Sequence, residues 1–240
     1  MKVDILAIGV HPDDIELSCS GTLLKQKAMG KSFGMLDLTL GELGSRGTPT
    51  LRTEEAMNAA KILGASFREQ LDLGDGFFEH NKASIVEIVK IIRYCQPEIV
   101  LCNALDDRHP DHGRSAKLQA DACFFSGLQR IETEFRGEKQ THWRPKAVYH
   151  YIQDKQLTPD FVVDVTPFME QKMESILAYQ SQFHNPNYKK EEIQTPISGK
   201  GFMDFMYAKN RVFGRSINVE FAEGFNKSRI FGVKDLFDLI

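Results

Sequence analysis

The feature that most constrains the fold is a regular alternation of short apolar runs with longer segments of helical spacing. The first run, residues 3–10, is almost continuously apolar, which is typical of a strand buried on both faces of a parallel sheet. Helical and strand-like segments then alternate at residues 15–29, 33–40, 52–63, 67–73, 83–95 and 99–102. The pattern predicts an α/β fold: a Rossmann-like, doubly wound and mainly parallel sheet with helices on both faces.

The second half of the chain continues this pattern less regularly. Its predicted elements are a helix, two strands and a further helix, at residues 115–125, 146–152, 161–165 and 167–182. Thr166 as N-cap and Pro167 at the first position open the last of these helices. Residues 184–201 are polar and rich in Pro, Gly and Lys, so we expect a surface loop there. Because no repeat or linker interrupts the 240 residues, we expect one domain, residues 1–240.

The charge distribution excludes several classes of partner. The formal net charge is −3, and acidic and basic residues are interspersed. No basic stripe indicates a nucleic acid, and no polybasic segment indicates an anionic membrane surface. No apolar run is long enough to span a bilayer, and Asp4 within the short N-terminal run argues against a signal peptide. Small polar or acidic substrates remain.

The cysteines give no sign of a metal site or a disulfide framework. The four of them show no paired metal-type spacing: Cys19, Cys95, Cys102 and Cys123. We therefore expect a reduced, cytoplasmic protein whose cysteines pack as small core residues. Cys19 is the one that lies near the first polar cluster described next.

Two short polar clusters follow predicted strands. His11-Pro12-Asp13-Asp14 comes directly after the first strand, where a dinucleotide-binding enzyme would carry a GxGxxG sequence, so nucleotide binding is disfavoured. His109-Pro110-Asp111-His112 comes shortly after the strand over 99–102. Ligand sites in open α/β sheets gather at the carboxyl ends of strands. The two clusters are therefore expected to form one metal site.

The residue types in the clusters fit catalytic zinc chemistry. Such sites commonly combine three protein ligands with one open position for water, and His11, Asp14 and His112 would supply two imidazoles and one carboxylate. Asp13 and Asp14 are adjacent and cannot easily both point at one ion. Asp13 is therefore a candidate general base that takes a proton from a water acidified by the metal. Zn²⁺ is the expected ion, and Fe²⁺ is the alternative.

His109 and Asp111 are left over once His112 binds the metal. An imidazole beside a carboxylate can be held in one tautomer and kept protonated near neutral pH, so His109 is a candidate for stabilising an oxyanion, with Asp111 orienting it. The remaining histidines lack an acidic partner at ligand spacing and are expected to be structural or solvated. Among them, His150 is the one whose position, at a predicted strand end, is compatible with a role in the site.

The glycine-rich segment 41–49 has two interpretations. It is either a flexible connection or a substrate loop, in which case Glu42, Ser45 and Arg46 are polar groups over the site. Arg52, at the start of the next helix, is a candidate anion clamp. The alternative for Arg52 is a surface salt bridge with Glu55 or a neighbour.

The clusters carry a resemblance to a known family. A strand ending in His-Pro-Asp-Asp, then Glu16 and Gly21-Thr22, and a second strand followed by His-Pro-Asp-His resemble the LmbE-like, or PIG-L, family of zinc-dependent N-acetylglucosaminide deacetylases. Further segments resemble the branch that deacetylates N-acetyl-α-D-glucosaminyl L-malate in bacillithiol biosynthesis, at residues 37–56, 107–112, 177–183 and 222–225. Ser18 and Ser20 depart from the family pattern, since many relatives have glycine there.

The resemblance implies a function and a role for each cluster residue. It implies hydrolysis of the acetamide of an N-acetylglucosamine that carries an α-linked malate, and a homo-oligomer, often a hexamer among relatives. It implies that Arg52 contacts the substrate. The cluster residues would act as zinc ligands (His11, Asp14 and His112), as the base (Asp13) and as the pair that handles the oxyanion and protons (His109 and Asp111).

Other functions compete with this one. The same chemistry applies to other GlcNAc conjugates and to chito-oligosaccharides. Two histidines and one carboxylate also describe a non-haem iron(II) oxygenase, but such an enzyme normally has a β-rich jelly roll, which the alternation contradicts. A metal-stabilised binding module is the non-enzymatic alternative, and it fails to explain why Asp13 and His109 flank the ligands.

Overall fold

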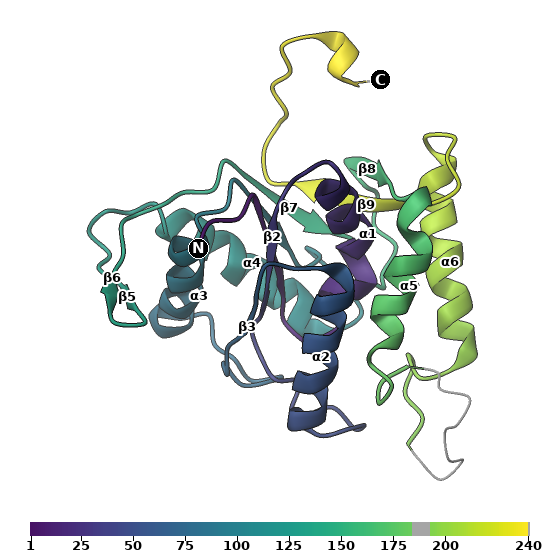
Figure 1. The fold of residues 1–240 in the computed structure, drawn as a ribbon, viewed down its shortest axis with the longest axis horizontal. Coiled ribbons are helices and arrows are strands. Elements are labelled where there is room, and N and C mark those ends of the chain that lie inside the picture. The colour runs from purple at the N-terminus through teal and green to yellow at the C-terminus, as the bar shows by residue number, and fades with distance from the viewer. Residues whose placement is uncertain (184–192, 240) are drawn as a thin grey trace.

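A seven-stranded sheet forms the centre of the molecule (Figure 1). The computed structural model describes residues 1–183 and 193–239. In spatial order the strands are β3 (Arg68–Gln70), β2 (Phe33–Asp37), β1 (Ile5–Gly9), β4 (Ile99–Cys102), β7 (Ala147–Tyr151), β9 (Ala222–Lys227) and β8 (Phe161–Asp164). The first five are parallel, and β9 runs antiparallel to both of its neighbours. The predicted α/β fold with a mainly parallel sheet is confirmed.

Helices cover both faces of the sheet. Their bounds are α1 (Asp14–Ala28), α2 (Pro49–Leu63), α3 (Lys82–Cys95), α4 (Pro110–Phe125), α5 (Met169–Leu177) and α6 (Lys200–Arg215). Short elements complete the described chain: the hairpin of β5 (Glu134–Phe135) and β6 (Glu138–Lys139), and the 3₁₀ turns Thr166–Phe168 and Leu236–Leu239. In Figure 1, α3 and α4 lie on one side of the sheet, and α1, α2, α5 and α6 lie on the other.

The alternation of side chains along each strand produces two apolar layers. Leu6 and Ile8 of β1 pack on the side of α3 and α4, whereas Ile5 and Ala7 pack on the side of α1 and α2. Both sets are buried, as the continuous apolar character of the first run predicts. A third apolar cluster joins α2, α5 and α6.

The order of the strands places the site. From β1 the chain runs outward through β2 to β3 and then returns through α3, so that β2 pairs with one edge of β1 and β4 with the other. Loops after β1 and β4 therefore diverge and leave a crevice at the carboxyl edge, which is where doubly wound sheets bind ligands.

Several predicted elements differ from the structure. α4 begins at Pro110 and not at 115, because His109 caps its first turn. The helix predicted over 167–182 is the shorter α5, preceded by a 3₁₀ turn. Of the loop predicted over 184–201, residues 184–192 lie outside the described residues, and α6 begins at Lys200. Across the described ranges, no helix is long and apolar enough to cross a membrane.

Candidate metal centre

The first polar cluster forms the turn that joins β1 to α1. Gly9 ends β1, and a Cβ atom there would lie 2.9 Å from the Cβ of Asp14, so the turn is too tight for a side chain. Asp13 has a left-handed backbone (φ 115°), a strained conformation that often marks functional positions. Oδ2 of Asp14 accepts hydrogen bonds from the backbone N–H groups of Val10 (2.9 Å) and His11 (3.0 Å). The turn thereby fixes the Asp14 carboxylate.

The second cluster begins α4, next to the first. Because β4 pairs with β1, the turns that follow the two strands meet at the same edge of the sheet. Nε2 of His112 lies 3.1 Å from Oδ1 of Asp14, and Nδ1 of His11 lies 3.8 Å from Oδ2 of Asp14. The fold therefore brings together the three residues predicted as metal ligands, although they come from distant segments of the chain.

Carboxylates contact the outer nitrogen of both ligand histidines. Asp107 contacts Nδ1 of His112. Nε2 of His11 lies 3.0 Å from Oδ1 of Asp75 and 3.3 Å from Oδ2 of Asp111. Histidines that bind metals usually donate their other ring N–H to such a group, which fixes the tautomer and the ring orientation. The inner nitrogens, Nδ1 of His11 and Nε2 of His112, are thus the ones directed at Asp14.

Amide side chains hold Asp14 from the other side. Nδ2 of Asn103 donates to Oδ2 of Asp14 (2.9 Å), and Nε2 of Gln153 donates to Oδ1 (3.0 Å). Gln119 in turn donates to the side-chain oxygen of Asn103 (2.6 Å). All of these side chains are buried. Such a network restricts the carboxylate to one orientation.

The charges around the two histidines favour a cation. Burial lowers the pKa of His11, but the carboxylates of Asp111 and Asp75 outweigh it and raise that pKa to about 10. Burial likewise lowers the pKa of His112, and Asp14 and Asp107 outweigh it and raise the pKa to about 9. A metal ion would supply this positive charge in place of the ring protons. The donor set of two imidazoles and one carboxylate fits Zn²⁺ or Fe²⁺.

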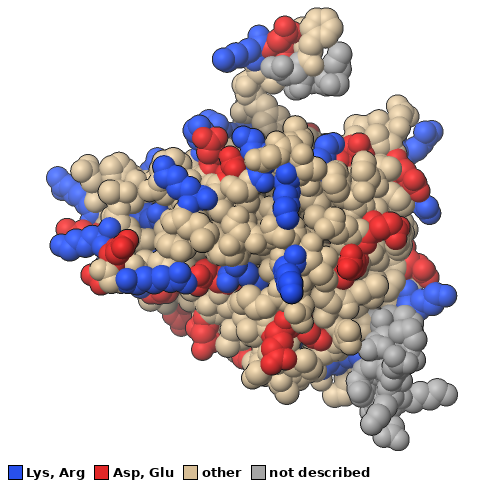
Figure 2. All heavy atoms as spheres, viewed as in Figure 1, with Lys and Arg blue, Asp and Glu red and all other residues tan. Residues whose placement is uncertain are grey.

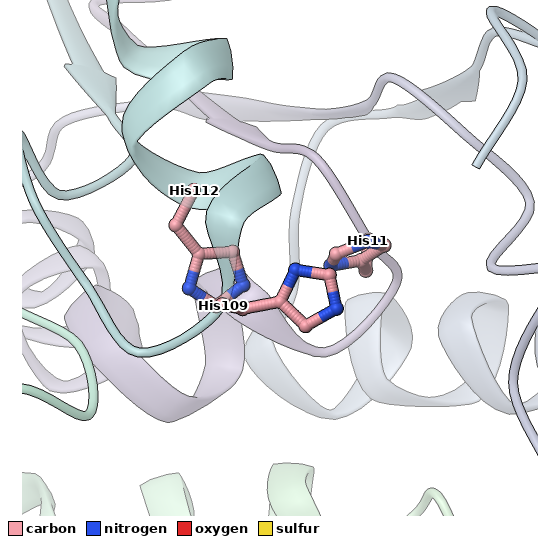
Figure 3. A group of neighbouring side chains, drawn as sticks. All are labelled: His11, His109 and His112. Atoms are coloured by element: carbon pink, nitrogen blue, oxygen red, sulfur yellow. The ribbon is translucent and has the colours of Figure 1, made fainter. Parts of the chain in front are cut away.

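Figure 3 shows the three imidazoles of the site side by side, His112 from α4 and His11 from the turn after β1. Potential ligand atoms of His11, His109 and His112 lie within 4.8 Å of one another. A second such group is His11 with Asp75 and Asp111, which lies at the outer nitrogen of the same imidazole. We interpret this second group as the hydrogen-bond partners of a ligand and not as another ion site.

Asp13 faces a different neighbour from Asp14. Its Oδ2 lies 3.2 Å from Nη2 of Arg52. Burial raises the pKa of Asp13 and the Arg52 guanidinium lowers it, with a net increase to about 7. A carboxylate that titrates near neutral pH suits the role of proton acceptor predicted for Asp13.

The pairing predicted between His109 and Asp111 needs correction. The Asp111 carboxylate contacts His11, accepts from the backbone N–H of Gly76 (2.9 Å) and lies 3.1 Å from Arg114. His109 instead accepts the backbone N–H of Asp111 at Nδ1 (3.3 Å). Burial and the nearby His11 lower the pKa of His109, so the ring is neutral and not protonated as expected. The reason is that α4 starts here, which turns the Asp111 side chain away from the capping residue.

Arg52 is not on the surface, as the predicted alternative of a salt bridge with Glu55 would require. It is buried, its Nη1 donates to the carbonyl of Gly41 (3.0 Å), and its Nη2 donates to the carbonyl of Pro12 (2.7 Å). Together with the contact to Asp13, these bonds engage both Nη atoms of the guanidinium with protein oxygens. Glu55 is bound to Ser181. Arg52 therefore organises the base and the glycine-rich loop, and the surface ion pair with Glu55 is wrong. Arg52 also lines the cavity, so its contact with the substrate stays a prediction.

The loop residues predicted as substrate contacts divide into two groups. Glu42 accepts the backbone N–H groups of Asp75 (2.6 Å) and Leu40 (3.2 Å), so it shapes the loop and does not line the cavity. Arg46 is buried. Its carbonyl accepts from Gln182 (2.7 Å). Ser45 is exposed and lines the cavity, as expected of a substrate contact.

A cavity of about 300 Å³ opens over the cluster residues. Its floor includes His11, Asp13, Asp14, His109 and His112. Its opposite wall comes from α6, which contributes Phe202, Phe205, Met206 and Lys209. The size and the mixture of apolar walls with a few polar groups are typical of a small-molecule site.

Four site residues are absent from the sequence-based prediction. They are Asp75, Asn103, Asp107 and Gln153. Asn103 directly follows β4, and Asp107 lies five residues before His112, so both positions carried a signal. Asp75 lies between two glycines with positive φ. This pattern indicates a turn, but it does not indicate that the Asp75 carboxylate contacts His11. His150 lies outside the cavity lining, and its Nδ1 contacts the carbonyl of Asn103 (2.8 Å), a structural role.

The sequence is similar to a known family and to characterised proteins. The profile of the family described as PIG-L, GlcNAc-PI de-N-acetylase, matches residues 6–123. The diacetylchitobiose deacetylase of Thermococcus kodakarensis is 30% identical over 189 residues, covering 75% of this chain and 70% of that protein. The 4-oxalmesaconate hydratase of Pseudomonas putida is 26% identical over 232 residues, covering 90% of this chain and 88% of that protein.

A solved structure matches almost the whole chain. The conserved protein TT1542 from Thermus thermophilus is 33% identical, with a TM-score of 0.83, over 97% of this chain and 98% of that chain. The region matched by the family profile contains both polar clusters and therefore every predicted metal ligand. On these grounds the chain belongs to the PIG-L family of de-N-acetylases.

Proposed function

We propose that the chain is a zinc-dependent deacetylase that converts N-acetyl-α-D-glucosaminyl L-malate to glucosaminyl-malate and acetate, the reaction of bacillithiol biosynthesis. Membership of a de-N-acetylase family supports the reaction type. The segments that resemble the malate-specific branch support the substrate. The observation that carries the proposal is the position of Asp13, a spare carboxylate beside the group formed by His11, Asp14 and His112.

The residues of the site divide the work of amide hydrolysis. His11, Asp14 and His112 would hold the ion, which when bound supplies a Lewis acid for the amide carbonyl and acidifies a water. Asp13 takes the proton of the attacking water as its oxygen bonds to the carbonyl carbon. When the C–N bond breaks, Asp13 returns this proton to the leaving nitrogen, so that acetic acid and a neutral amine are formed. The second proton of the attacking water stays on the new carboxyl group and then passes to the amine, which gives acetate and ammonium. His109 and Arg52 support these steps.

His109 acts as a neutral hydrogen-bond donor in this proposal. Because its Nδ1 accepts from the backbone of Asp111, its Nε2 carries the hydrogen. A fixed N–H at the cavity floor stabilises the oxyanion that develops on the carbonyl oxygen. Arg52 keeps Asp13 ionised and in place through the 3.2 Å contact between Nη2 and Oδ2.

The direct test is an acetate-release assay with three substrates and measured metal content. The substrates are GlcNAc-malate, free GlcNAc and N,N′-diacetylchitobiose. We expect the highest kcat/KM for GlcNAc-malate, loss of activity after chelation, and recovery with Zn²⁺. A preference for diacetylchitobiose would mean that the substrate is a chito-oligosaccharide and not the malate conjugate. If none of the three substrates released acetate, the proposal that the protein is a deacetylase would be rejected.

A hydratase is the second candidate, because the relative from Pseudomonas putida covers most of the chain. A base beside a metal-activated water serves the addition of water to a double bond as well as amide hydrolysis. The assay is consumption of 4-oxalmesaconate, followed by its ultraviolet absorbance. Turnover of this acid without acetate release from any amino sugar would favour the hydratase.

A further inference from the structure

The malate conjugate carries carboxylates, and the cavity must offer them a cation. Three lysine or arginine side chains line the described part of the cavity: Arg52, Arg108 and Lys209. A carboxylate binds well only to a cation that still has N–H groups directed at open space. The three side chains differ in this respect.

Two of the three cations are already engaged. Arg52 is buried and bonded to two carbonyls and Asp13. Its remaining Nε is buried without a partner and does not reach the cavity surface. Arg108 is half-exposed at the rim and pairs with Asp154. Arg52 therefore has no free donors over the site, and the charge of Arg108 is already balanced by Asp154 at its Nε.

Lys209 is the cation of the described cavity lining that has no carboxylate partner. It lies on the face of α6 that lines the cavity, and its Nζ donates to the carbonyl of Gln153 (2.9 Å). The side chain of the same Gln153 donates to Asp14, so Gln153 connects the ammonium group to one of the predicted metal ligands. An ammonium has three N–H donors, so the bond to Gln153 leaves two of them for a ligand.

The carboxylates around Lys209 have partners of their own. Asp154 pairs with Arg108, Asp107 contacts His112, and Glu223 pairs with Lys172 (2.6 Å). Within the described residues no carboxylate lies within ion-pair distance of Nζ of Lys209. Burial and the charge of Lys172 lower the pKa of Lys209 to about 8, the direction expected for a cation that lacks a counter-ion.

We propose that Lys209 binds a carboxylate of the aglycone of the substrate and so selects anionic GlcNAc conjugates over neutral ones. The inference rests on the proposed function and moves the anion-binding role from Arg52 to the α6 wall. The two free N–H groups of Lys209 bind the carboxylate, while the acetamide occupies the floor at Asp13 and His109. Phe205 and Met206, one turn earlier on α6, provide the apolar surface beside it.

The test compares a charged and a neutral α-glycoside on matched variants. The substrates are GlcNAc-malate and methyl N-acetyl-α-D-glucosaminide. The variants are Lys209→Met, Lys209→Arg and the control Lys200→Met, at an exposed position of the same helix. For Lys209→Met we expect kcat/KM for GlcNAc-malate to fall about 10- to 100-fold, as for a lost hydrogen bond to a charged group, with little change for the methyl glycoside. Lys209→Arg should restore part of the loss.

A binding measurement separates this inference from the proposed reaction. In the Asp13→Asn background, which lacks the base, calorimetry measures the Kd of both glycosides without turnover. We expect Lys209→Met to weaken GlcNAc-malate about 10- to 100-fold and to leave the methyl glycoside unchanged. An equal loss of affinity for both glycosides would show that Lys209 only positions Gln153, and it would overturn the inference. Unchanged affinity for GlcNAc-malate would overturn it as well. Absence of acetate release by the wild type would reject the proposed function independently.

Discussion

Adjacent aspartates at the start of α1 have different environments and therefore different expected roles. Asp14 contacts both ligand histidines, whereas Asp13 contacts Arg52. We expect Asp13→Asn to keep the metal and to lower kcat by roughly 10²- to 10⁴-fold, since a general base is lost. Asp14→Asn should instead lower metal occupancy. Metal analysis and kcat on the same samples check both; similar metal loss in the two variants would contradict the division.

The pKa of Asp13 leads to a second prediction at this scale. A base must be deprotonated, so activity falls as the pH falls through its pKa, which burial raises to about 7 against the opposing effect of Arg52. Removing the cation in Arg52→Met should raise the pKa further and move the acidic limb of the kcat profile to higher pH. Arg52→Lys, which keeps the charge, should move it less. An unchanged limb in Arg52→Met would assign Arg52 to loop structure alone.

Individual site residues were predictable only where a local pattern exposed them. His11, Asp14 and His112 stand in two short clusters, one directly after β1 and the other shortly after β4, so sequence and topology place them together. Asp75 could not be found this way, because its partner His11 lies 64 residues away in another loop. The pairing of Asp111 depends on the first turn of α4, whose start was predicted several residues late. Contacts made by long-range folding carry no local signature.

At the scale of elements, a buried ion pair joins α1, α5 and β9. Nζ of Lys172 lies 2.6 Å from Glu223 and also donates to the carbonyls of Glu16 (3.2 Å) and Leu17 (3.0 Å). Glu223 accepts the backbone N–H groups of Gly21 (2.9 Å) and Thr22 (2.7 Å). The pair therefore fixes α1, the helix whose first turn carries Asp13 and Asp14.

Breaking this ion pair should be costly. Glu223→Gln leaves the buried Lys172 ammonium without a counter-charge, and we expect the free energy of unfolding to fall by about 3–5 kcal/mol. The double variant Lys172→Met with Glu223→Gln removes the orphan charge and should lose less than the single variant. Urea unfolding of the three proteins gives the comparison. A double variant at least as unstable as Glu223→Gln would show that the charge is not the cause.

Besides the small hairpin of β5 and β6, the sequence analysis did not predict β9 and α6, which depend on tertiary contacts. β9 contains Glu223 and Gly224 and has no apolar alternation, yet it pairs with β7 and β8. α6 carries apolar residues at helical spacing, but its aromatic residues are moderate helix formers and it follows a polar segment. Both lie in the last third of the chain, where the βα alternation ends. The wall of the cavity that holds Lys209 was therefore not foreseen.

At the scale of the whole molecule, charged side chains are spread over the surface, whereas several exposed apolar side chains gather on the C-terminal segment. On the face shown in Figure 2, basic and acidic side chains are interspersed, as they are along the sequence. The C-terminal segment after β9 extends away from the body in Figure 1. Phe231 anchors its start, with ring centroids 5.9 Å from Tyr149 and 5.3 Å from Phe161. Beyond this anchor, Leu236 and Phe237 are 77% and 76% exposed.

An exposed apolar arm of this kind supports the proposal that the protein is a homo-oligomer, since large exposed apolar groups usually mark contacts between proteins. We expect light scattering after size exclusion to give a mass that is a multiple of the 27.3 kDa chain. The double substitution Leu236→Ser with Phe237→Ser, which keeps the Phe231 anchor, should shift the mass toward that of a single chain at low concentration. Lys234→Ser in the same arm is the control and should leave the mass unchanged. A wild-type mass of one chain would refute the oligomer, and an unchanged mass in the double variant would exclude the arm as its contact.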